Sequence, residues 1–450
     1  MKSKPTLVLS AVVAALGGFL FGFDTAVISG TTQWLEEFFG LTSATLGFTV
    51  ASAILGTIAG AVVVGRPSDK YGRKYVLFIL ALLYLGSAIG SALAENWLMF
   101  LIYRFLGGIG VGGSSVVAPI YIAEITPARK RGRMVAVVQF NVVTGMLIAY
   151  LSNYLISTLN LGNVEWRWMF GVEAFPALLF FLLLFLIPRS PRWLVARGKV
   201  DEARGVLEKC GTDSGSVEEE IREIKDSLEQ LSGQPKEKLF IRKYRKPIFL
   251  AMAIALFNQL SGINALLYYA PHVFKMAGAG TQSALLQSVA IGGTFVLFTM
   301  LAMSIIDRVG RKTLMMVGSM GYIISLAVTA WAFYTYGTDF DKAGSTVVLV
   351  SVIVFMASHA FGQGTVIWVF ISEVFPNAVR ARGQALGSFT HWFMAAVISW
   401  TFPIIAEISG GHTFAFYAIC MIGQLLWVLF VMPETKGLTL ESIQKKLHIK

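Results

Sequence analysis

Long apolar runs separated by short polar segments are the dominant pattern of this chain. A helix needs about 20 residues to cross the hydrocarbon layer of a bilayer, where its backbone groups must be satisfied internally. The runs reach that length and predict an all-α integral membrane protein with twelve transmembrane helices. The expected spans are residues 6–30, 44–65, 75–94, 97–121, 134–158, 168–188, 248–274, 283–306, 313–336, 346–371, 383–408 and 413–432.

The composition favours a membrane protein over a large soluble enzyme. Of the 450 residues, 55% are hydrophobic and 14% are charged, whereas a soluble domain has roughly 25% charged residues. The net charge of +11 does not indicate a nucleic-acid partner, because the basic residues lie at the ends of apolar runs. The two cysteines, Cys210 and Cys420, have no metal-binding spacing. We expect no metal, no cofactor and no enzymatic activity.

Three short polar cassettes occur once in each half of the chain, with partners 238, 249 and 245 residues apart (307 − 69, 373 − 124 and 433 − 188). Duplicated halves in lipid are typical of transporters. We therefore predict two pseudo-symmetric six-helix bundles, 1–194 and 247–432, with a cytoplasmic helical linker at 195–246 and a cytoplasmic tail at 433–450. The paired cassettes are Asp69–Lys74 and Asp307–Lys312, Glu124–Arg131 and Glu373–Arg380, and Pro188–Arg192 and Pro433–Lys436.

The basic residues predict the topology. With the N-terminus inside, only Arg167, Lys275 and Lys342 lie in outside loops and Arg104 lies within a span, so 33 of the 37 basic residues (37 − 3 − 1) are cytoplasmic. Lys and Arg are enriched on that side of membrane proteins. Both termini are therefore expected inside. In the linker, the apolar spacing favours short amphipathic helices, and the alternative is a disordered linker.

Asp24 and Arg104 are the most costly residues inside the predicted spans. A charge at mid-membrane costs about 2.5–3.5 kcal/mol on insertion scales, so we expect them to pair. Burial favours the protonated form of a carboxyl group, while a nearby guanidinium favours the ionised form. Movement of Arg104 relative to Asp24 would then switch proton affinity; the alternative is a static ion pair. Glu173 either assists this relay or bonds to a neighbouring backbone group.

The repeated cassettes predict cytoplasmic latches between helices. Arginine donates a fork of hydrogen bonds to carboxylates and to carbonyls at helix ends, and a glutamate ends spans four and ten. We expect these latches to favour the outward-facing state, whereas the alternative is that the charges only anchor the topology. The latch residues are Asp69, Arg73, Glu124, Arg131, Asp307, Arg311, Glu373 and Arg380.

These motifs resemble those of the sugar porters of the Major Facilitator Superfamily, and the resemblance covers nearly the whole chain. It rests on the doubled cassettes and on Gly22–Asp24, Pro188–Trp193, Gln259–Asn264 and Pro433–Gly437. It implies sugar contacts at Gln139, Asn258, Gln259, Asn264, Gly364, Trp368, His391 and Trp392.

The chemistry of these side chains agrees with the resemblance. Amides both donate and accept hydrogen bonds, as sugar hydroxyls require, and aromatic faces cover the apolar side of a sugar ring. Hydrogen bonds between helices, and core packing, would account for the same residues without a sugar. Tyr268 and Tyr269, which precede Pro271, are candidates for an outer gate or for simple packing. The chain departs from the family at Phe295, where Asn is usual, and at Arg189, where Glu is usual.

We therefore predict a proton-coupled symporter that imports a pentose or hexose by alternating access. Its expected location is the bacterial inner membrane, and its expected partners are a monosaccharide, a proton and the lipid bilayer. We expect a monomer. A sugar uniporter would share most of these features, although the acid at position 24 favours symport. A non-transporting sugar receptor would normally carry a long signalling tail, and a drug antiporter would need more acids in the presumed cavity to bind a cationic drug.

Overall fold

The computed structural model describes residues 5–127, 131–211, 214–233, 237–438, 440–447 and 449. Within these residues the secondary structure is helical, and twelve helical segments are long and apolar enough to cross a membrane. This confirms the predicted fold class. The twelve segments are Pro5–Gly30, Ser43–Val63, Arg73–Ala92, Trp97–Ile125, Met134–Thr158, Gly162–Leu186, Arg242–Met276, Thr281–Ile306, Arg311–Tyr336, Lys342–Val374, Arg380–Ile408 and Gly410–Phe430.

The residues form two compact units. Unit 1 comprises Met1–Val27, Leu55–Ala149 and Val164–Pro235, and unit 2 comprises Ile28–Ile54, Tyr150–Asn163 and Lys236–Lys450. Two helices pass from one unit into the other: α3 (Ser43–Val63) begins in unit 2, and α7 (Arg131–Thr158) ends there. The domain boundaries expected from the sequence stay predictions.

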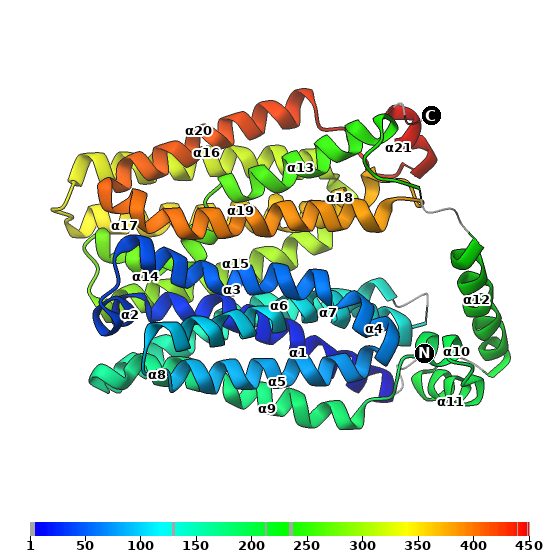
Figure 1. The fold of residues 1–450 in the computed structure, drawn as a ribbon. Helices are drawn as coiled ribbons and strands as arrows, with labels where there is room; N and C mark the ends of the chain where they lie inside the picture. The colour runs from blue at the N-terminus through cyan, green and yellow to red at the C-terminus, as the bar shows by residue number, and fades with distance from the viewer. Residues whose placement is uncertain are drawn as a thin grey trace. The chain divides into compact units, whose positions relative to one another are not determined.

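Unit 1 is built on long helices that pack through small residues. In Figure 1, α5 and α6 lie side by side, and α6 also packs on α1. A hydrophobic core runs through these helices and includes Tyr84, Tyr121 and Phe180. Besides parts of α3 and α7, its helices are α1 (Pro5–Val27), α4 (Gly65–Tyr71), α5 (Arg73–Ala92), α6 (Trp97–Ile125), α8 (Glu165–Gly171), α9 (Ala174–Leu183), α10 (Pro191–Ala196), α11 (Val200–Cys210) and α12 (Ser214–Gly233).

The polar segment after the sixth span forms three helices joined by short non-helical stretches within its described residues. Helices α10, α11 and α12 pack on one another beside the ends of α1 and α6 (Figure 1). Ala203, Val206 and Leu207 of α11 are buried in the core of unit 1, as are Cys210 and Ile221. The apolar spacing of this segment therefore marks the faces that the short helices bury.

In unit 2, α16 packs on both α17 and α20, and α13 packs on α19 (Figure 1). The residues that begin α3 and end α7 contact this unit: Tyr150 donates to the Leu267 carbonyl at 2.7 Å, and Trp400 Nε1 donates to the Ala44 carbonyl at 3.1 Å. The helices are α2 (Thr32–Phe39), α13 (Arg245–Leu260), α14 (Ile263–Met276), α15 (Thr281–Val309), α16 (Arg311–Tyr336), α17 (Lys342–Phe361), α18 (Gln363–Val374), α19 (Arg380–Ile408), α20 (Gly410–Phe430) and α21 (Leu440–Lys446).

Candidate functional site

Asp24 on α1 and Arg104 on α6 form a buried ion pair in unit 1. Arg104 Nη1 lies 2.5 Å from Asp24 Oδ1, and Nη2 lies 3.3 Å from both Oδ2 and the Asp24 carbonyl. The two residues are only 2% and 1% exposed. A charge this deeply buried is tolerated because its partner and hydrogen bonds replace the lost water. The structure thus brings together the two residues whose pairing the sequence predicts.

Glu173 lies beside this pair, in the break between α8 and α9. It is 1% exposed and close enough to interact electrostatically with both Asp24 and Arg104. Its Oε1 atom is buried without a hydrogen-bond partner among the described residues. The Phe170 ring covers the guanidinium, with 5.3 Å between its centroid and Arg104 Cζ. Two carboxyl groups therefore lie near one guanidinium in a buried site, and one aromatic ring covers that guanidinium.

Close helix packing around Asp24 explains two of the glycines near it. At Gly22 a Cβ atom would lie 1.8 Å from the carbonyl oxygen of Val142 on α7. At Gly107 it would lie 2.3 Å from Ser87 Oγ and 3.5 Å from Asp24 Oδ1. Small residues allow helices in lipid to approach one another in this way. The glycines therefore allow α1, α6 and α7 to pack closely around the ion pair.

The seventh span is broken in unit 2, and its break presents the amides expected to bind sugar. Gly262 separates α13 from α14 with φ +83°, a left-handed conformation that favours glycine. A Cβ atom there would also lie 2.7 Å from the Tyr417 ring. On either side of the break, Gln259 Nε2 donates to Asn258 Oδ1, and Asn264 Nδ2 donates to Gln259 Oε1, both at 2.9 Å.

Aromatic residues of α18 and α19 adjoin this amide cluster. His391 lies within hydrogen-bond distance of Gln259 Nε2, at 3.3 Å through Nδ1. Its ring centroid is 5.0 Å from that of Trp368 and 4.9 Å from that of Trp392. Trp368 remains 40% exposed. A Cβ atom on Gly364 would lie 3.1 Å from His359. Neutral donors, neutral acceptors and an exposed aromatic face therefore occur together, as recognition of a polyhydroxylated molecule requires.

Three further residues predicted for the site lie on α7 and α14. Gln139 is half-buried on α7 in unit 1. Tyr269 on α14 is buried and donates to the Ser399 carbonyl at 2.9 Å, and its ring lies 5.2 Å from that of Phe402. Tyr268 is also buried. The backbone of Tyr269 leaves the helical region (φ −125°, ψ 19°), so α14 bends where a gate was expected.

In unit 1, the first of the two predicted latches is a network of contacts that joins α5 to the end of α6. Arg73 Nη2 donates to Glu124 Oε1 at 3.0 Å, and Arg73 Nε lies 2.9 Å from Glu124 Oε2. Arg73 Nη1 also contacts Asp69 Oδ1 at 3.0 Å and donates to the Ser68 carbonyl at 3.0 Å. Ser190 Oγ donates to Glu124 Oε2 at 2.6 Å.

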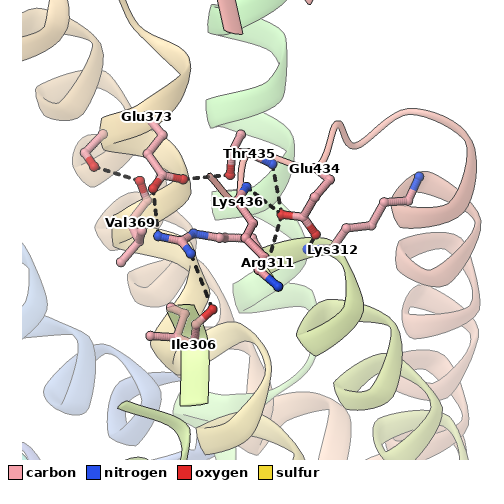
Figure 2. Close-up of polar contacts among 9 residues, drawn as sticks. Ile306, Arg311, Lys312, Val369, Glu373, Glu434, Thr435 and Lys436 are labelled. Atoms are coloured by element: carbon pink, nitrogen blue, oxygen red, sulfur yellow. Dashed lines mark hydrogen bonds and ion pairs between the residues drawn. The ribbon is translucent and has the colours of Figure 1, made fainter. Parts of the chain in front are cut away.

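Unit 2 repeats this arrangement almost group for group (Figure 2). Arg311 Nη2 donates to Glu373 Oε1 at 2.9 Å, and its Nη1 donates to the Ile306 carbonyl at 3.3 Å. Thr435 Oγ1 takes the place of the serine hydroxyl and donates to Glu373 Oε2 at 2.7 Å. The duplicated sequence has therefore produced a duplicated network.

Glu434 gives the second latch a feature that the first lacks. Its carboxylate accepts backbone N–H groups from Arg311 and Lys312 at 3.0 Å and from Thr435 and Lys436 at 2.9 Å (Figure 2). Burial raises the pKa of Glu434, but these four hydrogen bonds together lower it by more, so the pKa lies below its usual value. Arg189 occupies the corresponding position of unit 1, and an arginine side chain cannot accept hydrogen bonds from backbone N–H groups.

Not every predicted latch residue pairs with a glutamate. Arg380 Nε donates to the Phe375 carbonyl at 3.4 Å, and its Nη2 is buried without a partner among the described residues. The side chains of Arg131 and Asp307 lie outside the described part of the chain. Ser190, Thr435 and Glu434 are not among the latch residues predicted from the sequence. A hydroxyl residue follows the proline by two positions in both members of the third cassette pair, and this shared spacing was the sequence signal for the Ser190 and Thr435 hydroxyls.

The chain matches known proteins over nearly its whole length. The family described as sugar (and other) transporters matches residues 10–447. The D-xylose-proton symporter of Escherichia coli (strain K12) is 37% identical over 96% of this chain and 94% of that protein. The D-xylose transporter of Levilactobacillus brevis is 37% identical over 97% of this chain and 94% of that protein.

The fold of this chain is also similar to a solved structure over nearly its whole length. The inward open conformation of the xylose transporter XylE from E. coli matches with a TM-score of 0.85 and 36% identity, over 98% of this chain and 99% of that chain. Sequence and fold thus agree on a transporter rather than an enzyme, as expected. The chain belongs to the sugar transporter family.

Proposed function

We propose that this protein is a proton-coupled symporter that imports a monosaccharide by alternating access. The observation that carries the proposal is the buried Asp24–Arg104 pair with Glu173 beside it, because a facilitator needs no titratable acid there. The relatives support it, since one that is 37% identical is a D-xylose-proton symporter. Ionisable residues inside membrane spans commonly serve proton relays.

In the proposed cycle, Asp24 exchanges the proton and Arg104 sets its affinity. While the guanidinium contacts the carboxylate, the ionised form is stabilised; when the pair separates, the buried carboxyl group binds a proton. Glu173 is the second proton acceptor, because its buried Oε1 atom has no hydrogen-bond partner within the described residues. The proton and the sugar are released on the same side of the membrane. The chemical step of the cycle is proton transfer, and no covalent bond of the sugar changes.

Sugar binding is proposed to use Gln139 of unit 1 and, in unit 2, Asn258, Gln259, Asn264, Gly364, Trp368, His391 and Trp392. The amides of unit 2 already bond to one another, so a sugar hydroxyl can replace each of these bonds without leaving a buried polar group unpaired. Tyr268 and Tyr269 are the proposed outer gate. The networks around Glu124 and Glu373 are the proposed cytoplasmic latches.

The proposed location is the bacterial inner membrane, with both termini cytoplasmic and the protein monomeric. The excess of basic residues in the loops on one side supports this orientation. On this topology, the helical segment after the sixth span is cytoplasmic and joins two six-helix bundles, 1–194 and 247–432.

The decisive experiment measures sugar accumulation and sugar exchange in energised vesicles. One proton crossing about 100 mV supplies roughly 2.3 kcal/mol, which supports a sugar gradient of about 40-fold. Asp24→Asn should abolish accumulation and sugar-driven alkalinisation while exchange continues. Asp341→Asn is the matched control, because Asp341 caps α17 through its side-chain oxygen and Asn caps equally well.

Three results would contradict the proposal. Sugar accumulation that persists in the presence of an uncoupler would exclude proton coupling, because some other gradient or energy source would then have to drive it. Undiminished accumulation by Asp24→Asn would exclude this residue as the proton site. A binding panel of pentoses, hexoses and hydrophobic cations then identifies the substrate class, and binding of the cations alone would contradict a sugar site.

A further inference from the structure

Unit 2 contains a large cavity that lies outside the proposed sugar and proton sites. It has a volume of about 1260 Å³ and lies among the beginning of α13, the end of α20 and α21. A second cavity of about 650 Å³ adjoins the beginning of α13. Arg242, Arg245 and Phe249 line both cavities. The segment 242–249 therefore contributes two guanidinium groups and one aromatic ring to the lining of both cavities.

The larger cavity is strongly basic. Its lining includes Arg242, Lys243, Arg245, Lys246, Lys312 and Lys446, and Glu434 is its one acid. The Glu434 carboxylate is already engaged by four backbone N–H groups. Lys312 and Lys446 donate to the carbonyls of Leu429 and Glu434, at 2.9 and 3.3 Å, so neither charge is neutralised by these contacts. The cavity thus retains a large positive charge.

The two shared arginines are available to an external anion. Lys243 contacts Glu237 at 3.5 Å, whereas neither Arg242 nor Arg245 has an ion pair among the described residues. Both arginines are exposed. Arginine matches the geometry of phosphate oxygens and gives bidentate hydrogen bonds. A phosphate group between them would relieve the repulsion of like charges.

An apolar surface begins one helical turn from these cations. Phe249 follows Arg245 by four residues and is 57% exposed, while Phe430 at the end of α20 is 80% exposed. Ile248 and Met252 continue the lining of the smaller cavity. The site therefore has a cationic end and a hydrocarbon end, separated by about the 6 Å rise of four helical residues. A soluble phosphate would leave the hydrocarbon end uncovered.

We propose that these cavities bind an anionic phospholipid of the cytoplasmic leaflet, its phosphate held by Arg242 and Arg245 and its acyl chains lying on Phe249 and Phe430. The side of the membrane rests on the proposed topology. Basic pockets between helices on the cytoplasmic side suit such headgroups. Because Lys312 and Glu434 belong to both this cavity and the second latch, a bound lipid also contacts the helices that the latch joins.

Native mass spectrometry of the purified full chain tests this inference. Phosphatidylglycerol should bind at least tenfold more tightly than phosphatidylcholine with the same acyl chains. Arg242→Gln/Arg245→Gln should weaken phosphatidylglycerol binding by about 30-fold, at roughly fivefold per cation. It should weaken phosphatidylcholine binding much less, because the choline cation offsets the charge of the phosphate. Phe249→Ser should weaken both lipids. Arg222→Gln/Lys225→Gln, which removes two exposed charges from α12, is the matched control and should change binding less than threefold.

Three outcomes would overturn the proposal: equal binding of the two lipids, equal losses in the arginine and control variants, or displacement of phosphatidylglycerol by inorganic phosphate at similar concentration. Melting temperatures of the variants verify that they fold. The measurement uses neither sugar nor a proton gradient, so its failure would leave the proposed transport untouched. A failure of the transport assay would likewise leave the lipid result standing.

Discussion

The buried Asp24–Arg104 pair permits a quantitative test in which both partners are varied singly and together. The nitrogen–oxygen distance is 2.5 Å and the side chains are 3% and 2% exposed. Removing one partner leaves an uncompensated buried charge, which costs about 3–5 kcal/mol. We therefore expect Asp24→Asn and Arg104→Gln each to lower the free energy of unfolding by that amount. The double variant has neither charge and should lose much less than the sum.

The assay is equilibrium unfolding of the purified protein in mixed micelles, followed by tryptophan fluorescence at pH 7. The expected coupling energy is about 2 kcal/mol or more, at the upper end of the range for contacting pairs. Arg204 and Glu218 provide the control cycle, because they contact at 2.7 Å but are exposed. Water screens that pair, so its coupling should be far smaller. Additivity of the Asp24 and Arg104 variants within about 0.5 kcal/mol would refute the interpretation of a mutually compensating pair.

Three further predictions concern the latch, the helix packing and the amide cluster. The lowered pKa of Glu434 means that its stabilisation is present above the unfolded value and is lost as pH falls through the folded value. The difference in melting temperature between wild type and Glu434→Gln should therefore shrink below about pH 4.5, and a constant difference would contradict this. Gly22→Ala should destabilise by about 1–3 kcal/mol because its Cβ would overlap the Val142 carbonyl. In a thermal shift assay Gly86→Ala, with nothing within 4 Å, should be neutral or stabilising, and equal effects would count against the packing argument. Gln259→Leu should weaken sugar binding at least tenfold in calorimetry, because it removes an amide within hydrogen-bond distance of three neighbours, Asn258, Asn264 and His391; unchanged affinity would show that Gln259 does not contribute to the sugar site.

The sequence predicts those features that depend on composition or on a repeated pattern. Apolar length alone locates the spans, because hydrocarbon excludes unsatisfied backbone groups. The doubled cassettes predict that Arg73 meets Glu124, because the same residues recur at matching positions in both halves. In the first case the requirement acts within a single segment of the chain. In the second case the same residues occur at matching positions in both halves.

Other features depend on tertiary contacts that leave no local signal. The Tyr150 hydroxyl donates to the Leu267 carbonyl, which lies 117 positions further along the sequence. No motif near either residue predicts this hydrogen bond. The capture of four backbone N–H groups by Glu434 depends on where the chain turns after α20. The amide cluster was expected from the family resemblance, but its bonds depend on the left-handed backbone of Gly262. Such features require the folded chain.

The five points at which the chain changes unit, after residues 27, 54, 149, 163 and 235, have a consequence for dissecting this protein. A fragment that starts at residue 236 would lack the segments that hold α14 and α19 through Tyr150 and Ala44. We therefore expect that neither half of the duplicated sequence folds correctly on its own. Reconstitution from two separately synthesised fragments should succeed only when both are present during membrane insertion.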